Sequence, residues 1–125
     1  MSRRAPHGSI ACLAALALGG CDAPGEDGPT VRGGDADRGR ATLARLECGV
    51  CHVIPGVPGV RGHLGPSLAQ YRHRVYLAGR FPNTPEVLVR WLLDPPSMLP
   101  DTAMPALDVT EAEARDMAAY LYTLE

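Results

Sequence analysis

The feature that most constrains this chain is the pentapeptide Cys48-Gly49-Val50-Cys51-His52. Its spacing is that of covalent c-type haem attachment, in which two thiols bind the two vinyl groups of one porphyrin. The imidazole of the adjacent His52 then meets the iron from the same side and becomes its proximal ligand. The motif therefore predicts a fold built around one covalent haem c.

Composition agrees with a core that includes a cofactor. The chain has 125 residues, enough for one domain, and only one Trp, one Phe and four Tyr. A domain of this size often needs a staple, a metal or a cofactor to be stable. The net charge of −2 excludes a generally basic nucleic-acid binder.

Residues 1–20 have the layout of a secretory signal peptide. Arg3 and Arg4 precede the apolar run 10–18, which is too short to span a bilayer. The ending Leu18-Gly19-Gly20-Cys21 resembles the lipobox of bacterial lipoproteins. We expect cleavage before Cys21 and a diacylglycerol on its sulfur; the alternative is an ordinary signal peptide cut nearby.

Residues 21–34 are predicted to be a flexible tether, since they are rich in Gly, Pro and acidic residues and lack apolar periodicity. Residues 35–125 then form the monohaem domain. The expected location is the periplasmic side of the bacterial inner membrane, as a lipoprotein, or the soluble periplasm if there is no lipid.

The cysteines allow other interpretations. Cys12 lies inside the signal, and Cys48 and Cys51 could form a disulfide in an exported chain. A thioredoxin-like pair has no use for the following histidine. A zinc site could add His63 and His73, but their separation is outside the usual spacing.

A second axial ligand is expected downstream of the motif. Met117 belongs to an apolar helical stripe, so core packing is the better interpretation for it. Met98 stays open, and Met104 lies in a loop that can project a thioether at a flat ring. The candidates are His63, His73, Met98, Met104 and Met117.

From Gly34 to Glu125 the chain resembles a class I cytochrome c. The motifs that carry the resemblance are Cys48–His52, Gly65-Pro66, Asp94-Pro95, Thr102-Ala103-Met104-Pro105 and the closing segment Thr110–Leu124. The resemblance implies an all-α fold of about four helices around one covalent haem. It also implies that Met104 is the distal ligand, that the Pro66 carbonyl accepts the Nδ1 proton of His52, and that Trp91 lies against the haem. The segment 78–86 resembles small cytochromes associated with terminal oxidases.

Local signals predict the helices independently of this resemblance. Asp35 and Asp37 begin a first helix that reaches about Leu46, and Gly39 inside it is tolerable if another helix approaches there. The second helix is marked by an N-cap and a following proline, and it ends at a pair of prolines. The last helix begins with a capping box. These signals are Thr84-Pro85, Pro95-Pro96 and Thr110–Glu113. No alternating strand pattern appears.

Iron held by both His52 and Met104 has no open position, so the expected function is electron transfer in a respiratory chain rather than catalysis on a small-molecule substrate. The partners would be redox proteins, with a terminal oxidase as one candidate, and the membrane through the lipid anchor. Two alternatives stay open. The chain could be a haem subunit fixed in an oxidase or dehydrogenase complex, or a ligand-binding sensor whose distal ligand is labile.

Charge is distributed unevenly along the domain. Between Cys48 and Pro85 there are arginines and no acidic residue, whereas acidic residues dominate from Glu86 onward. This asymmetry could steer docking onto an acidic partner, although scattered solubilising charge explains it as well. The candidate partners of the haem propionates are Arg72, Arg74, Arg80, Tyr71 and Tyr76.

Overall fold

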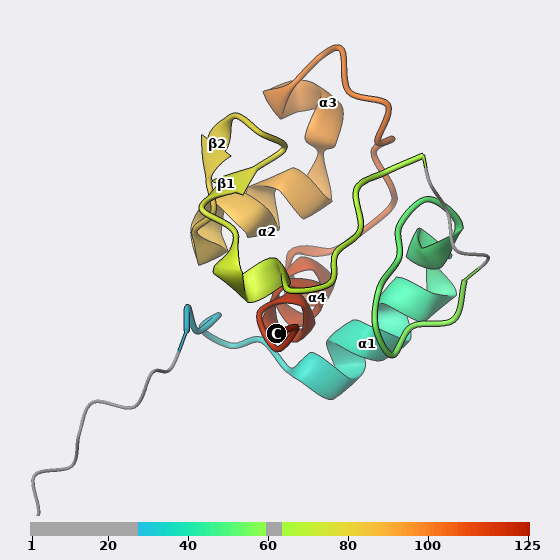
Figure 1. Cartoon of the computed structure of the whole chain (residues 1–125), viewed down its shortest axis with the longest axis vertical. Helices are drawn as coiled ribbons and strands as arrows, with labels where there is room; N and C mark the ends of the chain where they lie inside the picture. Colours follow the sequence, from blue (N-terminus) through green and yellow to red (C-terminus); the bar gives the residue numbers. More distant parts are fainter. Residues whose placement is uncertain (1–27, 60–63) are drawn as a thin grey trace, which may run out of the picture.

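The computed structural model describes residues 28–59 and 64–125 and is built mainly from helices (Figure 1). The mostly helical architecture agrees with the predicted all-α class. The predicted signal peptide, Cys21 and His63 lie outside the described residues. The elements are α1 (Ala36–Arg45), η1 (Cys48–Val50), η2 (Tyr71–His73), β1 (Tyr76–Leu77), β2 (Phe81–Pro82), α2 (Pro85–Leu93), α3 (Pro95–Met98) and α4 (Glu111–Leu121).

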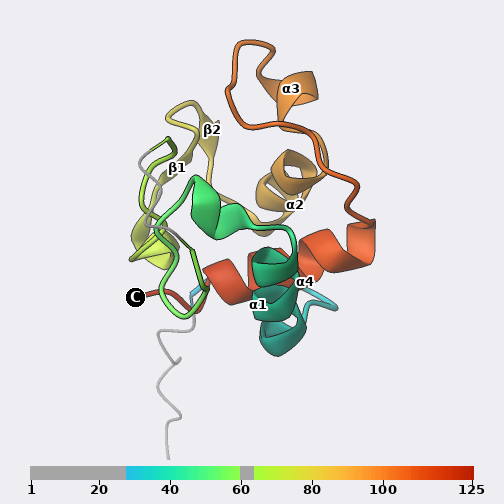
Figure 2. The same cartoon turned by 90° about the vertical axis from the view of Figure 1, so that its right-hand side faces the viewer.

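The first and last helices cross in close contact, as Figure 2 shows. At the crossing, a Cβ on Gly39 of α1 would lie 1.9 Å from the backbone oxygen of Asp116 in α4. No side chain fits there, so glycine is required although it weakens an isolated helix. The prediction that another helix approaches Gly39 is confirmed.

Two ion pairs join these helices near opposite ends of α1. The buried Asp116 carboxylate accepts bonds from the Asp35 backbone N–H at 2.8 Å and from Arg38 Nε and Nη2 at 2.8 and 2.9 Å. These bonds, led by those from Arg38, lower the pKa of Asp116. At the other end, Arg45 Nη2 donates to Glu113 Oε1 at 2.6 Å. The crossing is therefore held by polar contacts as well as by packing.

The predicted helix starts are confirmed by their caps. Asp35 accepts a bond from the Arg38 N–H at 2.9 Å at the start of α1. Thr84 caps α2 with Pro85 in the first turn. The capping box of α4 joins Thr110 and Glu113, with bonds of 3.0 and 3.3 Å.

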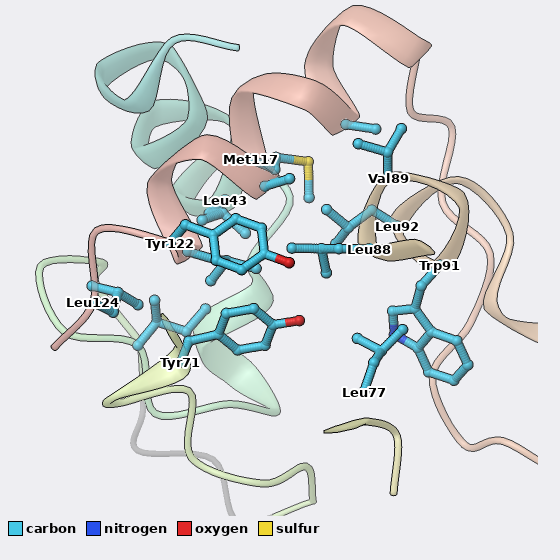
Figure 3. Close-up of a cluster of buried hydrophobic side chains, with 14 residues drawn as sticks. Leu43, Tyr71, Leu77, Leu88, Val89, Trp91, Leu92, Met117, Tyr122 and Leu124 are labelled. Carbon is cyan, nitrogen blue, oxygen red and sulfur yellow. The ribbon is translucent and has the colours of Figure 1, made fainter. Parts of the chain in front are cut away.

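The core lies between α1, α2, α4 and the segment that includes η2, and Leu43 is the buried side chain that α1 contributes (Figure 3). The side chains of Leu88, Trp91 and Leu92 are buried on one face of α2, as the sequence pattern predicts. The rings of Tyr71 and Tyr122 pack edge to face, with centroids 5.7 Å apart. Both hydroxyls donate to Asn83 Oδ1, at 2.9 and 3.0 Å, so these buried polar groups are satisfied.

Two short elements differ from the sequence expectations. Strands β1 and β2 pair antiparallel around a turn in which Ala78 and Gly79 both have positive φ, 48° and 66°. Strands of two residues are too short to show an alternation of apolar and polar residues, so the sequence pattern does not predict them. The prolines at 95 and 96 end α2 as predicted, but they also open α3, because Asp94 caps it through the Ser97 N–H at 3.2 Å.

Candidate cofactor site

The Cys48–His52 motif forms a tight turn immediately after α1. Glu47 adopts a left-handed conformation with φ 55° and ends the helix. The Cys48 carbonyl oxygen then accepts bonds from the N–H groups of Cys51 and His52, at 3.3 and 3.0 Å. Both cysteines are free thiols, and both are partly buried. The turn therefore brings two thiols and one imidazole together within five consecutive residues.

The His52 ring is held by Gly65 and Pro66, which lie thirteen and fourteen positions after it in the chain. Its Nδ1 lies 2.8 Å from the carbonyl oxygen of Pro66, the contact expected from the class I resemblance. Since a carbonyl oxygen can only accept, Nδ1 carries the proton and donates it. The lone pair of Nε2 is then left for a metal ion, which is the usual arrangement of an imidazole ligand.

Gly65 supports the same ring from its flank. A Cβ at this position would lie 2.3 Å from His52 Cε1 and 2.6 Å from Nδ1, so any larger residue would displace the imidazole. The Gly65 N–H donates to the Cys51 carbonyl oxygen at 2.8 Å, which ties it to the motif. The resemblance implied a role for Pro66 and none for Gly65, although the Gly65-Pro66 pair was itself a signal in the sequence.

A second close approach closes the loop that returns from the motif. A Cβ on Gly49 would lie 2.3 Å from the Pro58 carbonyl oxygen, and one on Gly59 would lie 2.4 Å from the Gly49 carbonyl oxygen. The two backbone stretches are therefore in direct contact, with no room for a side chain at either glycine. No local pattern in the sequence indicated this contact, because it joins residues about ten positions apart.

The outer part of this loop is fixed to the helix crossing. Tyr120 of α4 donates to the Pro55 carbonyl oxygen at 2.7 Å, and Arg40 of α1 donates to the Gly56 carbonyl oxygen at 3.3 Å. A hollow of about 210 Å³ lies beside His52 and is also lined by Val53, Ile54, Val57 and Gly59. It is smaller than the usual pocket for a small molecule, so this hollow alone does not enclose a cofactor.

The environment of the Cys48 thiol differs from that of a reactive thiol in a redox pair. Burial raises the pKa of the Cys48 thiol, whereas a thioredoxin-like pair needs a lowered pKa. Within residues 28–59 and 64–125, no three His, Cys, Asp or Glu side chains are grouped as ligands of a metal ion. His73, which the zinc interpretation requires, is exposed on η2.

The candidate distal ligands occupy different environments. Met117 is 1% exposed in the core, which agrees with its interpretation as a packing residue. Met98 and Met104 are both partly buried against the core cluster. The Met104 N–H donates to Thr102 Oγ1 at 3.2 Å, in a loop without regular structure. Burial alone thus does not choose between them, and the assignment of Met104 stays a prediction.

The remaining predicted residues are spread around the core. Trp91 is buried on α2 with its ring centroid 6.3 Å from that of Phe81. Tyr71 is engaged with Asn83, and Arg74 contacts the Ser67 carbonyl oxygen and lies over the Tyr71 ring. Tyr76 and Arg80 are exposed. The role of Trp91 beside a haem stays a prediction, and so does the choice of propionate partner.

No family model matches this chain. It is similar to the cytochrome c oxidase subunit 2 of Alkalihalophilus pseudofirmus, with 31% identity over 91 residues. The matched region covers 72% of this chain but only 26% of that protein, so the chain spans about a quarter of the length of this relative. Among the residues that the structure describes, no helix is both long and apolar enough to span a bilayer.

Proposed function

We propose that this protein is an electron carrier with one covalent c-type haem. The observation that carries the proposal is the geometry of His52. Its Nδ1 proton is directed to the Pro66 carbonyl oxygen at 2.8 Å, directly after two free thiols with the attachment spacing. The donor set suits a haem, because Cys48 and Cys51 supply the two thioethers and His52 supplies Nε2.

The chain holds the ligand geometry rigid. Pro66 fixes the tautomer of His52, and Gly65 fixes the position of its ring. A bound haem would supply one-electron redox chemistry at its iron. The residues of this chain contribute attachment, orientation and exclusion of water, which keep the coordination the same in both oxidation states.

Met104 is the proposed distal ligand. Its loop is held by the contact between its N–H and Thr102 Oγ1, and its side chain is partly buried. A thioether ligand favours ferrous iron and raises the reduction potential. Together, His52 and Met104 would leave the iron of a bound haem no open coordination position for a substrate, which is why we propose a carrier and not an enzyme.

We propose further that the protein is exported and anchored by a diacylglycerol on Cys21, with the residues before Gly28 as a tether. From Gly28 onward the chain packs on the domain, with Gly28 against Arg72 and Gly34 against Arg115. The partial similarity to a cytochrome c oxidase subunit 2 supports a role in respiratory electron transfer, with a terminal oxidase as partner. The same similarity favours a second candidate, a haem subunit fixed in an oxidase complex. Co-purification with a membrane complex after mild detergent extraction would favour the fixed subunit over a free shuttle.

The deciding experiment is a visible spectrum of the full-length protein, oxidised and reduced, produced in a host with haem-attachment machinery. We expect a covalent low-spin c haem with the charge-transfer band of methionine ligation. Met104→Ala should abolish that band, and the matched variant Met98→Ala should retain it. Colourless protein would refute the proposal, and the opposite behaviour of the two variants would refute the ligand assignment.

A second experiment tests how His52 is positioned. Gly65→Ala places a methyl group against the imidazole, so we expect a shifted proton resonance of the His52 ring and an altered potential. Leu64→Ala is the control, since the Leu64 side chain is 83% exposed and should leave both unchanged. An unaltered ring signal in the Gly65 variant would contradict the role assigned to this glycine.

A further inference from the structure

A basic and apolar surface, here called the hairpin face, is formed by Arg72 to Phe81. Two large apolar side chains on it are strongly exposed, Val75 at 72% and Tyr76 at 61%. His73 and Arg80 are exposed beside them. Exposed aromatic and aliphatic groups next to cations are the composition of a surface that meets a lipid headgroup layer.

The charged side chains of this face are arginines, of which Arg80 is exposed and Arg72 is paired with Glu125. No acidic residue occurs between Cys48 and Pro85. Glu125 contacts the face from the C-terminus and is paired with Arg72. Arg80 is exposed at the end of the hairpin turn, where its backbone N–H donates to the Leu77 carbonyl oxygen at 3.0 Å. The face is therefore suited to an anionic surface.

The described chain begins on the same side of the molecule. Gly28 lies against the Arg72 guanidinium, because a Cβ there would be 2.6 Å from Nη2. Figures 1 and 2 both place this start and the C-terminus below the hairpin, in the same left-hand half of the view. Cys21 precedes Gly28 by seven residues, a distance of at most about 25 Å in a fully extended chain. A lipid on Cys21 would thus hold this side near the bilayer.

We infer that the hairpin face docks onto the anionic headgroups of the bilayer that carries the lipid anchor. The inference rests on the proposed lipidation of Cys21. The cations provide the attraction to anionic lipid, and Val75 and Tyr76 enter the interface. In Figure 1, η1 with the attachment motif lies on the opposite side from the hairpin. Docking therefore orients the His52 side away from the lipid, toward a partner protein.

The test is hydrogen exchange of the full-length mature protein on two kinds of vesicle. One contains phosphatidylcholine alone and the other adds phosphatidylglycerol. We expect the amides of residues 72–82 to exchange about fivefold more slowly on the anionic vesicles, and Arg80→Glu or Tyr76→Ser to remove this protection. Arg90→Glu and Leu64→Ser are matched controls, because both side chains are exposed elsewhere, and they should retain it.

The outcomes separate this inference from the proposals on which it rests. Equal exchange on both vesicles would overturn the docking, and protection that appears only when a purified acidic partner protein is added would assign the face to that partner instead. Flotation with either vesicle reports the lipid anchor, and the visible spectrum reports the haem. Protein that fails to float on both would overturn the anchor and this inference together, and would leave the haem assignment intact.

Discussion

The α1–α4 crossing and the Cys48–Pro66 segment are held in different ways. At the crossing, buried apolar side chains and the nearly enclosed Asp116 carboxylate join two helices. The described part of the Cys48–Pro66 segment has no regular helix beyond η1. It buries the side chain of Ile54, and the rest of it is held by backbone hydrogen bonds and by glycine contacts. Val50 in this segment is 49% exposed, whereas Leu43 at the crossing is 1% exposed.

This difference indicates a division of roles. Buried helix contacts contribute most of the stability of a small domain, whereas residues that bind or react are commonly placed on loops that such a scaffold supports. Substitutions at the crossing should therefore change global unfolding. Substitutions in the Cys48–Pro66 segment should mainly change the position of the His52 imidazole and the rate of local opening of this segment. They should change the free energy of global unfolding less.

The largest effect is expected at the closest contact of the crossing. Gly39→Ala brings a methyl group against the α4 backbone, and we expect a loss of about 3 kcal/mol or more in the free energy of unfolding. Helix propensity alone would give a gain of about 1 kcal/mol for the same change. Urea unfolding measures the difference. Ala41→Gly on the exposed face of α1 is the control and should cost only about 1 kcal/mol. A stabilised Gly39 variant would contradict the close approach.

The buried carboxylate should have the next largest effect. Asp116→Asn weakens three hydrogen bonds to a charged group, and we expect a loss of about 2 kcal/mol in urea unfolding at pH 7. Asp108→Asn in the exposed loop before α4 is the control and should stay within about 0.5 kcal/mol. If the two variants unfolded alike, the ion pair would not stabilise the crossing.

The same residue predicts how stability depends on pH. Bonds from Arg38 lower the pKa of Asp116 in the folded protein below its unfolded value of about 3.9. Its contribution is therefore complete above that value and is lost as the pH falls through the folded pKa. The difference between wild type and Asp116→Asn should be constant from about pH 7 to pH 5 and should shrink below about pH 4. A difference that grew on acidification would have the wrong sign.

The smallest effect is expected where the two regions meet. Tyr120→Phe removes the hydroxyl that donates to the Pro55 carbonyl oxygen at 2.7 Å, and we expect a loss of about 1 kcal/mol. Hydrogen exchange should become faster in residues 53–57 and stay unchanged in α2. Tyr76→Phe, with an exposed ring, should alter neither region. Uniformly faster exchange would show that the crossing, and not the loop, depends on this bond.

Much of the helical architecture could be predicted from local chemistry. The caps at Asp35, Thr84 and Thr110 are encoded within three or four residues, and Gly39 signalled a close approach before its partner was known. The burial of Asp116 could not be predicted, since its partners Asp35 and Arg38 are about 80 positions away. The short hairpin was missed because its strands are shorter than one alternation.

For the candidate site, the sequence indicated which residues matter and left their spatial relation open. The attachment spacing singled out Cys48, Cys51 and His52. The resemblance singled out Pro66, and its carbonyl oxygen lies 2.8 Å from His52 Nδ1. The support from Gly65 depends on the return path of the chain, which no local pattern encodes. Burial does not separate Met98 from Met104, because both are partly buried against the core cluster.

The contact between Gly49 and Gly59 limits how this protein can vary. Position 49 lies between the two cysteines, where the Cys-x-x-Cys-His spacing alone does not fix the residue type, yet here a side chain would collide with the backbone of Pro58 and Gly59. A bulkier residue at 49 would need a compensating change ten positions later. Variants with a larger residue at position 49 should therefore fold only when the backbone at Pro58 and Gly59 is also redesigned.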